Sequence, residues 1–247
     1  PVITDCIVRG NSGKLGAGVA GSPTMERCVI TANTSSLNHG GGLYGAPTLM
    51  ECVVAMNSAT SADGGGLYVK GGKSLVVDSL FLENRAIFAN SHGGGIYVDS
   101  TGDLELRSSL LVGNYSTGGA FAGYGGAMRV ESPGTTVEGC TIIGNSVSGS
   151  STKGGGIYGP AVVHNSIVRD NVGGDLELAT ATWCDVSGGY PGIGNVDLSP
   201  GFVDEANRDF HLGHGSPVID LGDPSSFDPD GTRADLGAFP FATLYTR

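Results

Sequence analysis

The sequence predicts an all-β fold, a parallel β-helix of about seven to eight coils that ends in an irregular C-terminal cap. Two short motifs that alternate along the chain carry this prediction. In the first motif a Cys or Ser is followed five residues later by Asn, and in the second a run of Gly precedes an aliphatic residue and usually Tyr. The seven asparagines are Asn11, Asn33, Asn57, Asn84, Asn114, Asn145 and Asn171. Their spacing of 22 to 31 residues indicates a solenoid, because a self-similar period in this range is typical of stacked repeats.

Each repeat offers about three short β segments. One runs from the Cys or Ser to the Asn, one follows the glycines, as in residues 66–69, and one precedes the next Cys or Ser, as in residues 75–77. No window shows a helical period with capping residues, so we expect almost no helix. Three strands per repeat, stacked in register at ~4.8 Å per coil, describe a parallel β-helix.

The repeated residues have architectural roles in this fold. We expect the Asn side chains to stack into a ladder that satisfies backbone groups at one corner, and the glycines to supply positive φ or close backbone approach at the next corner. Cys6, Cys28, Cys52 and Cys140 share one repeat position that Ser fills in other coils, which indicates an inward row of small residues with free thiols. Cys184 has no place in this pattern.

The repeats predict one domain with two parts. Residues 1–180 form the repeats, and residues 181–247 form a terminal coil and a cap that continue the same helix. The spacing fails after Asn171, where Pro, Asp and aromatic residues become frequent. A solenoid end exposes both its core and its strand edges, so an atypical terminal unit is expected there.

Composition argues against two classes of partner. The formal net charge is -11 and the pI is about 4.7, which disfavours nucleic acid and anionic lipid headgroups. No stretch approaches the ~20 apolar residues of a membrane span, so we expect no membrane insertion. The chain opens inside a repeat, which predicts that upstream residues, including any export signal, are missing.

Two groups of motifs resemble known bacterial families. The pairing of the glycine motif with aliphatic-x-x-Asn resembles the repeats of the polymorphic outer membrane proteins. The C-terminal stretch resembles the end of the choice-of-anchor Q family. Its motifs are Asn195-Val196-Asp197, Pro200-Gly201-Phe202-Val203-Asp204, Asp209-Phe210-His211-Leu212, Gly215-Ser216-Pro217-Val218-Ile219-Asp220 and residues 228–239. The resemblance implies a right-handed β-helix in a bacterial protein that is secreted or held at the cell surface.

One corner of the predicted coils varies in length, and a binding side is commonly built from such loops. The residues just before the glycines are His39, Asp63, His92, Tyr124 and Lys153. Stacked along one edge, they would form a polar groove for a long glycan. The alternative is that they are solvated loop tips.

Tyrosines recur directly after the aliphatic residue of the glycine motif. They are Tyr44, Tyr68, Tyr97 and Tyr158, with Arg129 in the gap. Adjacent tyrosine rings would either stack on sugar rings or form a cross-strand ladder that stabilises the sheet.

A second row has outward parity and is aliphatic. It consists of Ile7, Val29, Val53, Leu80, Leu110 and Ile167, with Thr141 in register. Because large exposed apolar patches are uncommon on monomers, this row is predicted to be covered by a missing segment or to bind a protein partner.

Closely spaced carboxylates near the C-terminus suggest a calcium site. Asp228, Asp230 and Asp235 surround the glycine of Asp230-Gly231. The alternative is an Asx-turn in which Arg233 pairs with a carboxylate.

No catalytic set stands out, and we name no catalytic residue, although an acid–base pair such as His92 with Asp63 is geometrically compatible with adjacent coils. The first hypothesis is therefore an exported or cell-surface bacterial β-helix domain with a structural, adhesive or glycan-binding role. The second is a polysaccharide-active enzyme, a lyase or epimerase acting on acidic glycans.

Overall fold

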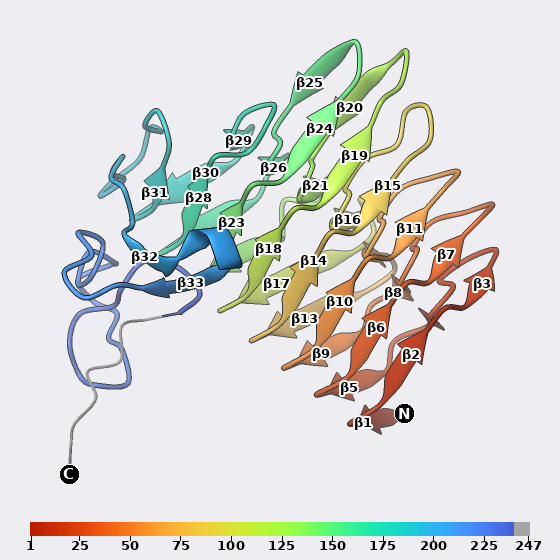
Figure 1. Ribbon diagram of the computed structural model, residues 1–247, viewed down its shortest axis with the longest axis horizontal. Coiled ribbons are helices and arrows are strands. Elements are labelled where there is room, and N and C mark those ends of the chain that lie inside the picture. The colour runs from red at the N-terminus through yellow and green to blue at the C-terminus, as the bar shows by residue number, and fades with distance from the viewer. Residues whose placement is uncertain (240–247) are drawn as a thin grey trace.

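The computed structural model describes residues 1–239 and confirms the parallel β-solenoid (Figure 1). Within this part of the chain the only helix is a single 3-10 turn, η1 (Glu205–Asn207). Four parallel sheets, named here A to D, run along the solenoid. No helix of the described residues is long and apolar enough to cross a membrane.

Sheets A and B each contain eight strands, which agrees with the predicted number of coils. Sheet A consists of β1 (Val2–Thr4), β5 (Thr24–Glu26), β9 (Thr48–Met50), β13 (Lys73–Val77), β17 (Asp103–Arg107), β22 (Thr136–Glu138), β27 (Val162–His164) and β30 (Thr180–Thr182). Sheet B consists of β2 (Ile7–Arg9), β6 (Val29–Thr31), β10 (Val53–Ala55), β14 (Leu80–Leu82), β18 (Leu110–Val112), β23 (Thr141–Ile143), β28 (Ile167–Arg169) and β31 (Asp185–Val186).

Sheet D carries the strands that follow the glycines. It consists of β4 (Val19–Ala20), β8 (Leu43–Gly45), β12 (Leu67–Val69), β16 (Ile96–Val98), β21 (Met128–Val130), β26 (Ile157–Tyr158) and β29 (Leu176–Glu177). Two smaller sheets join β20 (Ala122–Tyr124) to β25 (Ser151–Lys153) and β32 (Phe202–Asp204) to β33 (Asp209–Leu212). The last pair is antiparallel.

Sheet C was not expected, because the sequence suggested three strands per coil. Its strands begin directly after the Asn corner, where the prediction placed only loop. They are β3 (Ser12–Gly13), β7 (Thr34–Ser35), β11 (Ser58–Ala59), β15 (Arg85–Ala86), β19 (Tyr115–Thr117) and β24 (Ser146–Ser148). All six are two or three residues long and most contain Ser or Thr, so the apolar alternation that marks a strand in a sequence is absent.

The predicted asparagine ladder is present. From Asn11 to Asn171, each side-chain Nδ2 donates to the Oδ1 of the asparagine in the next coil, at 2.9 to 3.0 Å. Asn171 donates in turn to Asp175 Oδ1 at 2.8 Å, and this carboxylate ends the ladder. The glycine corner is as tight as expected, since a Cβ on Gly65 would lie 2.4 Å from the carbonyl oxygens of Arg85 and Gly94.

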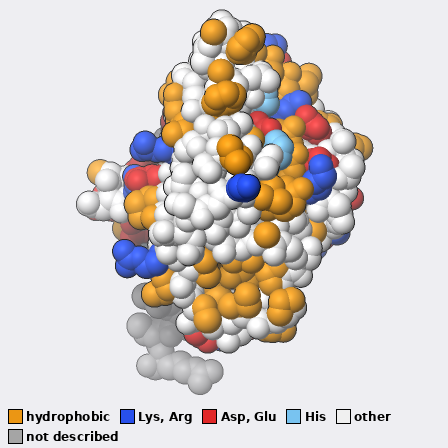
Figure 2. Space-filling model, turned by 90° about the vertical axis from the view of Figure 1, so that its right-hand side faces the viewer, with side chains coloured by type: hydrophobic (Ala, Val, Ile, Leu, Met, Phe, Trp, Pro, Cys, Tyr) orange, Lys and Arg blue, Asp and Glu red, His pale blue; other side chains and the backbone are white. Residues whose placement is uncertain are grey.

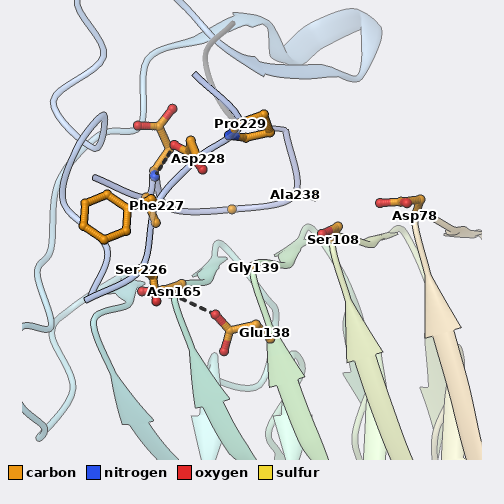
Figure 3. Close-up of a pocket in the computed structure, with 13 residues that line it drawn as sticks. Asp78, Ser108, Glu138, Gly139, Asn165, Ser226, Phe227, Asp228, Pro229 and Ala238 are labelled. Atoms are coloured by element: carbon orange, nitrogen blue, oxygen red, sulfur yellow. Dashed lines mark hydrogen bonds between the residues drawn. The ribbon is translucent and has the colours of Figure 1, made fainter. Parts of the chain in front are cut away.

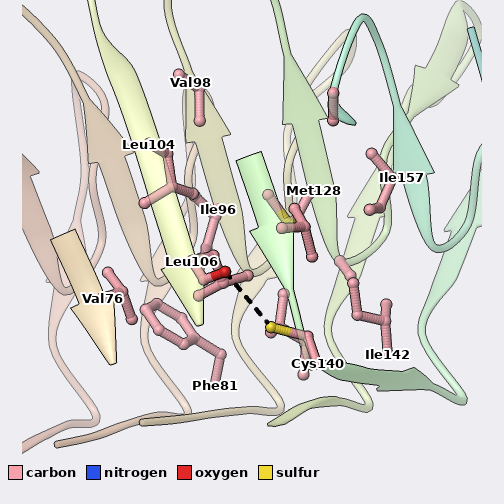
Figure 4. Packing of buried hydrophobic residues seen from close by; sticks show 14 of the residues in the cluster. Val76, Phe81, Ile96, Val98, Leu104, Leu106, Met128, Cys140, Ile142 and Ile157 are labelled. Atoms are coloured by element: carbon pink, nitrogen blue, oxygen red, sulfur yellow. Dashed lines mark hydrogen bonds between the residues drawn. The ribbon is translucent and has the colours of Figure 1, made fainter. Parts of the chain in front are cut away.

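The core confirms the inward row of small residues. Cys28, Cys52 and Cys140 are fully buried, all five cysteines are free thiols, and the Cys140 thiol donates to the Leu106 carbonyl at 3.7 Å (Figure 4). Cys6, in the first coil, is exposed. Cys184 proves to be the eighth member of the row, because it directly precedes β31, which pairs with β28.

The end of the solenoid is closed by residues 187–198, called here the end cap. The Tyr190 ring packs against the core, and its hydroxyl donates to the Ala179 carbonyl at 2.7 Å. Asn195 accepts from the Cys184 N–H at 2.9 Å and donates to the Ala181 carbonyl at 2.9 Å. These bonds give partners to backbone groups of Ala179, Ala181 and Cys184 in the last coil, which has no further coil to pair with.

The sequence suggested that residues 200–239 would cap the end of the solenoid. Instead they lie along the outer face of sheet B (Figure 1). We call this segment the C-terminal cover. Phe210 packs with Leu110, and Leu212, Val218 and Leu236 pack with Ile167. The later half of the outward aliphatic row is thus covered by the chain itself. Residues 240–247 of the predicted cap fall outside the described residues.

The earlier half of that row is not covered in the same way. Ile7 is 67% exposed, and Val29 and Val53 are half-buried. Thr141, the residue that breaks the aliphatic pattern, accepts a hydrogen bond from the Ala238 N–H at 3.0 Å, so this departure from the pattern anchors the cover.

Candidate functional site

The predicted ligand-binding residues come together on the outer face of sheet D and at the corner beside it. His39, Asp63, His92, Tyr124 and Lys153 each precede the first glycine of successive coils. Backbone bonds hold these coils in register, since Gly64 N–H donates to the His92 carbonyl at 3.1 Å and Gly93 N–H to the Tyr124 carbonyl at 3.2 Å. We call this corner row, together with the outer face of sheet D, the sheet D strip.

The tyrosines form the second row of the strip. Tyr44, Tyr68 and Tyr97 are in register on β8, β12 and β16. The Tyr68 ring stacks on Tyr44 at 5.5 Å and on Tyr97 at 4.9 Å between centroids. Tyr68 and Tyr97 are only 5% and 7% exposed, so a ligand would meet the ring edges rather than the ring faces. This geometry is that of the cross-strand ladder.

Arg129 interrupts the tyrosine row on β21. Its guanidinium carbon lies 4.6 Å from the Tyr158 ring centroid and 5.7 Å from that of Tyr124, and these two rings stack at 4.4 Å. The cation therefore rests on aromatic faces, an arrangement that keeps it at the surface of the sheet while reducing its exposure to water.

Acidic residues form a third row, which the sequence reasoning missed. The Tyr68 hydroxyl donates to Asp99 at 3.2 Å, and the Tyr97 hydroxyl donates to Glu131 at 2.7 Å. Burial, followed by these carboxylates, raises the pKa of both phenols above the ordinary range, so they stay protonated. Asp99 and Glu131 stand two residues after Tyr97 and Arg129, and strict period-two alternation would have identified them.

Every carboxylate of the strip faces a basic group. Lys70 Nζ lies 3.3 Å from Asp99, Arg129 lies 3.5 Å from Glu131, and Lys153 Nζ lies 3.0 Å from Glu177. At the corner, His39 Nδ1 lies 3.3 Å from Asp63 Oδ2. The strip is consequently rich in polar groups but nearly balanced in charge, unlike the chain as a whole.

His92 lies at the centre of the strip. Burial lowers the pKa of its imidazole, which favours the neutral ring near pH 7. Asp63 Oδ1 accepts from the His92 backbone N–H at 2.8 Å, and the ring lies 5.1 Å from Tyr124. Among the described residues, neither His92 Nδ1 nor Arg129 Nε has a hydrogen-bond partner, although both atoms are buried.

The predicted calcium ligands lie elsewhere, in the C-terminal cover. Asp230 Oδ1 accepts from the Thr232 N–H and hydroxyl at 2.9 and 2.7 Å, which is an Asx-turn. Asp228 accepts from the Asp235 N–H at 2.8 Å. Arg233 Nε donates to the Gly222 carbonyl at 2.6 Å, and its guanidinium carbon lies 5.0 Å from the Trp183 ring centroid.

Asp228 and Asp235 border a cavity of about 360 Å³ between the cover and the corner that joins sheets A and B (Figure 3). Asp78, Glu138 and Asp228 line it, and Asn165 donates to Glu138 at 2.8 Å. Burial raises the pKa of Asp228 to about 6. No group of three acidic, His or Cys side chains in residues 1–239 is placed to hold a metal ion, so calcium binding stays a prediction.

Comparison with known proteins agrees with the fold. Residues 1–188 match the family described as right handed beta helix region. None of the curated proteins and none of the solved structures matches the chain significantly. Since the match covers well over half of the 247 residues, the chain belongs to the right-handed β-helix region family.

Proposed function

We propose that this β-helix is part of an exported bacterial surface protein, and that the sheet D strip binds an extended glycan. The observation that carries the proposal is the continuous row of imidazole, carboxylate, ammonium and guanidinium groups across consecutive coils. Such groups bond sugar hydroxyls, and the coil repeat of ~4.8 Å presents them at regular intervals to an extended chain. The resemblance of the repeats to polymorphic outer membrane proteins, and of the C-terminal stretch to the choice-of-anchor Q family, supports the surface location.

The balance of charge in the strip favours a neutral or weakly charged glycan. Asp99, Glu131 and Glu177 are each offset by a base, so neither a polyanion nor a polycation gains much from long-range attraction. We expect a glycan array to give signals with neutral polymers and weak signals with polyuronates.

The test uses paired substitutions of matched chemistry. Lys70→Ala with Glu131→Gln removes exposed polar groups from the strip, and Lys73→Ala with Glu105→Gln removes an ion pair from the outer face of sheet A. The first variant should lose binding to the glycans that the array identifies, whereas the second should keep it. Equal binding by both variants would place the glycan site elsewhere.

A lyase or epimerase is the second candidate, and the geometry around His92 favours it. Because the pKa of the His92 imidazole is lowered, the ring is able to accept a proton near neutral pH, and Asp63 lies one coil away. Incubation with uronate polymers and calcium, followed by ultraviolet absorbance, detects the unsaturated product of a lyase. A rate that His92→Gln abolishes would support catalysis, and no absorbance change would count against lyase activity.

Calcium binding at Asp228, Asp230 and Asp235 is tested separately by calorimetric titration. Heat of binding that Asp230→Ala removes would support the site. An Asx-turn alone predicts no heat with either protein.

A further inference from the structure

A hydroxyl, an imidazole and a carboxylate form a chain of contacts at the last two coils of the solenoid. His164 on β27 is in register with Thr182 on β30, and Thr182 Oγ1 lies 2.7 Å from His164 Nδ1. The other ring nitrogen, Nε2, lies 3.3 Å from Asp223 Oδ2 in the C-terminal cover. We call these three residues the hydroxyl–imidazole cluster. The first coils face the viewer in Figure 2, so the cluster lies toward the far end of the molecule.

The carboxylate of Asp223 determines where the protons of the cluster lie. Its Oδ1 accepts from the N–H and the hydroxyl of Ser225 at 2.8 and 2.7 Å. These bonds, followed by the neighbouring His164, lower the pKa of Asp223, so the group is ionised near neutral pH. A carboxylate can only accept, and it therefore favours the neutral imidazole that carries its proton on Nε2. Nδ1 is then an acceptor, and the Thr182 hydroxyl donates to it.

An open cavity borders Thr182. It has a volume of about 590 Å³ and lies between β30 and residues 190–193 of the end cap. Thr182, Tyr190 and Ile193 are among the residues that line it, and Ile193 is 73% exposed. Because the lining is mostly apolar, the cavity suits a short apolar chain beside the hydroxyl.

We infer that Thr182 and His164 are catalytic residues for acyl transfer from activated esters and thioesters, with Asp223 as a positioning residue. Thr182 Oγ1 attacks the acyl carbon, and its proton passes to His164 Nδ1. The bond from this carbon to the leaving oxygen or sulfur breaks, the leaving atom takes the proton, and the acyl group stays on Thr182. Water then attacks the acyl carbon through the same imidazole. The products are a carboxylic acid and an alcohol or thiol, and Thr182 regains its proton.

The substrate class follows from the backbone that succeeds the hydroxyl. Trp183 N–H donates to the Ile193 carbonyl at 2.8 Å. Cys184 N–H donates to Asn195 Oδ1 at 2.9 Å. Both groups are thus occupied and do not stabilise an oxyanion, a contribution worth roughly 10²–10³ in rate. An acyl group with a weakly basic leaving group depends less on such donors, so aryl esters and thioesters are the expected class. This activity does not depend on the proposed glycan binding.

Hydrolysis of p-nitrophenyl butyrate, followed by absorbance, tests this inference together with mass spectrometry after an acid quench. The wild type and Thr182→Ser should release p-nitrophenolate and carry a butyryl group at position 182, whereas Thr182→Val should do neither. His164→Gln should slow acylation by about 100-fold or more. Thr136→Val alters an exposed threonine of the same sheet, two coils away, and should behave as wild type.

The role of Asp223 is tested by steady-state kinetics. Asp223→Asn should lower kcat and leave KM unchanged, since this carboxylate does not touch the ester. If the cluster only holds the C-terminal cover, His164→Gln and Asp223→Asn will speed amide exchange in residues 200–239 without changing ester hydrolysis. That result would overturn the inference. No butyryl group on wild-type Thr182, or equal modification of Thr136 and Thr182, would overturn it as well.

Discussion

Asn84 illustrates how single residues hold neighbouring coils together. Its Oδ1 accepts from the backbone N–H and the Nδ2 of Asn57 at 3.1 and 3.0 Å. Its Nδ2 donates to the Val54 carbonyl at 2.8 Å and to Asn114 Oδ1 at 3.0 Å. The side chain is fully buried, so water cannot replace any of these partners.

Asn84→Ala should therefore be strongly destabilising. The substitution leaves buried groups on Val54, Asn57 and Asn114 without partners, at a cost of roughly 1–3 kcal/mol for each group. We expect the free energy of unfolding, measured by urea titration, to fall by about 3 kcal/mol or more. Asn11→Ala is the matched control at the exposed end of the ladder and should cost about 1 kcal/mol or less. Similar losses for both variants would contradict the role of burial.

Residue spacing made the ladder and the glycine corner predictable, since both rest on one residue type recurring once per coil. The contacts of the sheet D strip were harder to predict. Tyr68 bonds Asp99 across 31 residues and Tyr97 bonds Glu131 across 34, so loops of different length hide the pairing. Sequence position predicted that the tyrosines form a row. The structure adds that the rings of Tyr68 and Tyr97 stack on each other, so these ring faces are not available to a ligand.

At the scale of elements, the C-terminal cover departs most from expectation. Its aromatic residues were predicted to close the end of the solenoid, yet the end cap does this with Tyr190 and Asn195. The cover instead buries an outward face of sheet B. Both the outward aliphatic row of sheet B and the apolar residues of the C-terminal segment can be recognised in the sequence. Their contact could not be predicted, because the two segments are far apart in the chain and no periodicity relates them.

Thr141→Val tests how the cover is held. Valine keeps the shape of the side chain but removes the hydroxyl that accepts from the Ala238 N–H, so that buried donor loses its partner. We expect faster amide exchange and easier proteolysis within residues 200–239, with the coils unaffected. Thr180→Val, on an exposed position of β30, is the control. Uniform exchange rates in wild type and Thr141→Val would mean that apolar packing alone fixes the cover.

The whole molecule combines a strongly acidic chain with two carboxyls whose pKa values are raised, one fully buried (Asp185) and one half-buried (Asp228). Burial raises the pKa of Asp185 and of Asp228 to about 6, from an ordinary value of 3.8. Between these values the native protein binds protons that the unfolded chain does not bind, so both groups make the free energy of unfolding rise as pH falls. His92 acts in the opposite direction, because its pKa is lowered by burial.

Replacing both carboxyls separates these opposing contributions. The double variant Asp185→Asn, Asp228→Asn keeps the hydrogen-bond acceptors but removes the ionisable groups. At about pH 7.5, where the wild-type carboxylates are charged in both states, the variant should be more stable than wild type. Its advantage should shrink as pH falls through 6 and level off below about pH 3, where the wild-type groups are protonated in both states. Urea midpoints measured across this range give the difference directly.

His92→Gln, compared in the same way, should lose its difference from wild type as pH rises above 6.5, because the imidazole is then neutral in both states. If the difference in the free energy of unfolding between wild type and the double variant stays constant with pH, neither carboxyl changes its pKa on folding. The acidity of the chain would then affect stability only through its net charge.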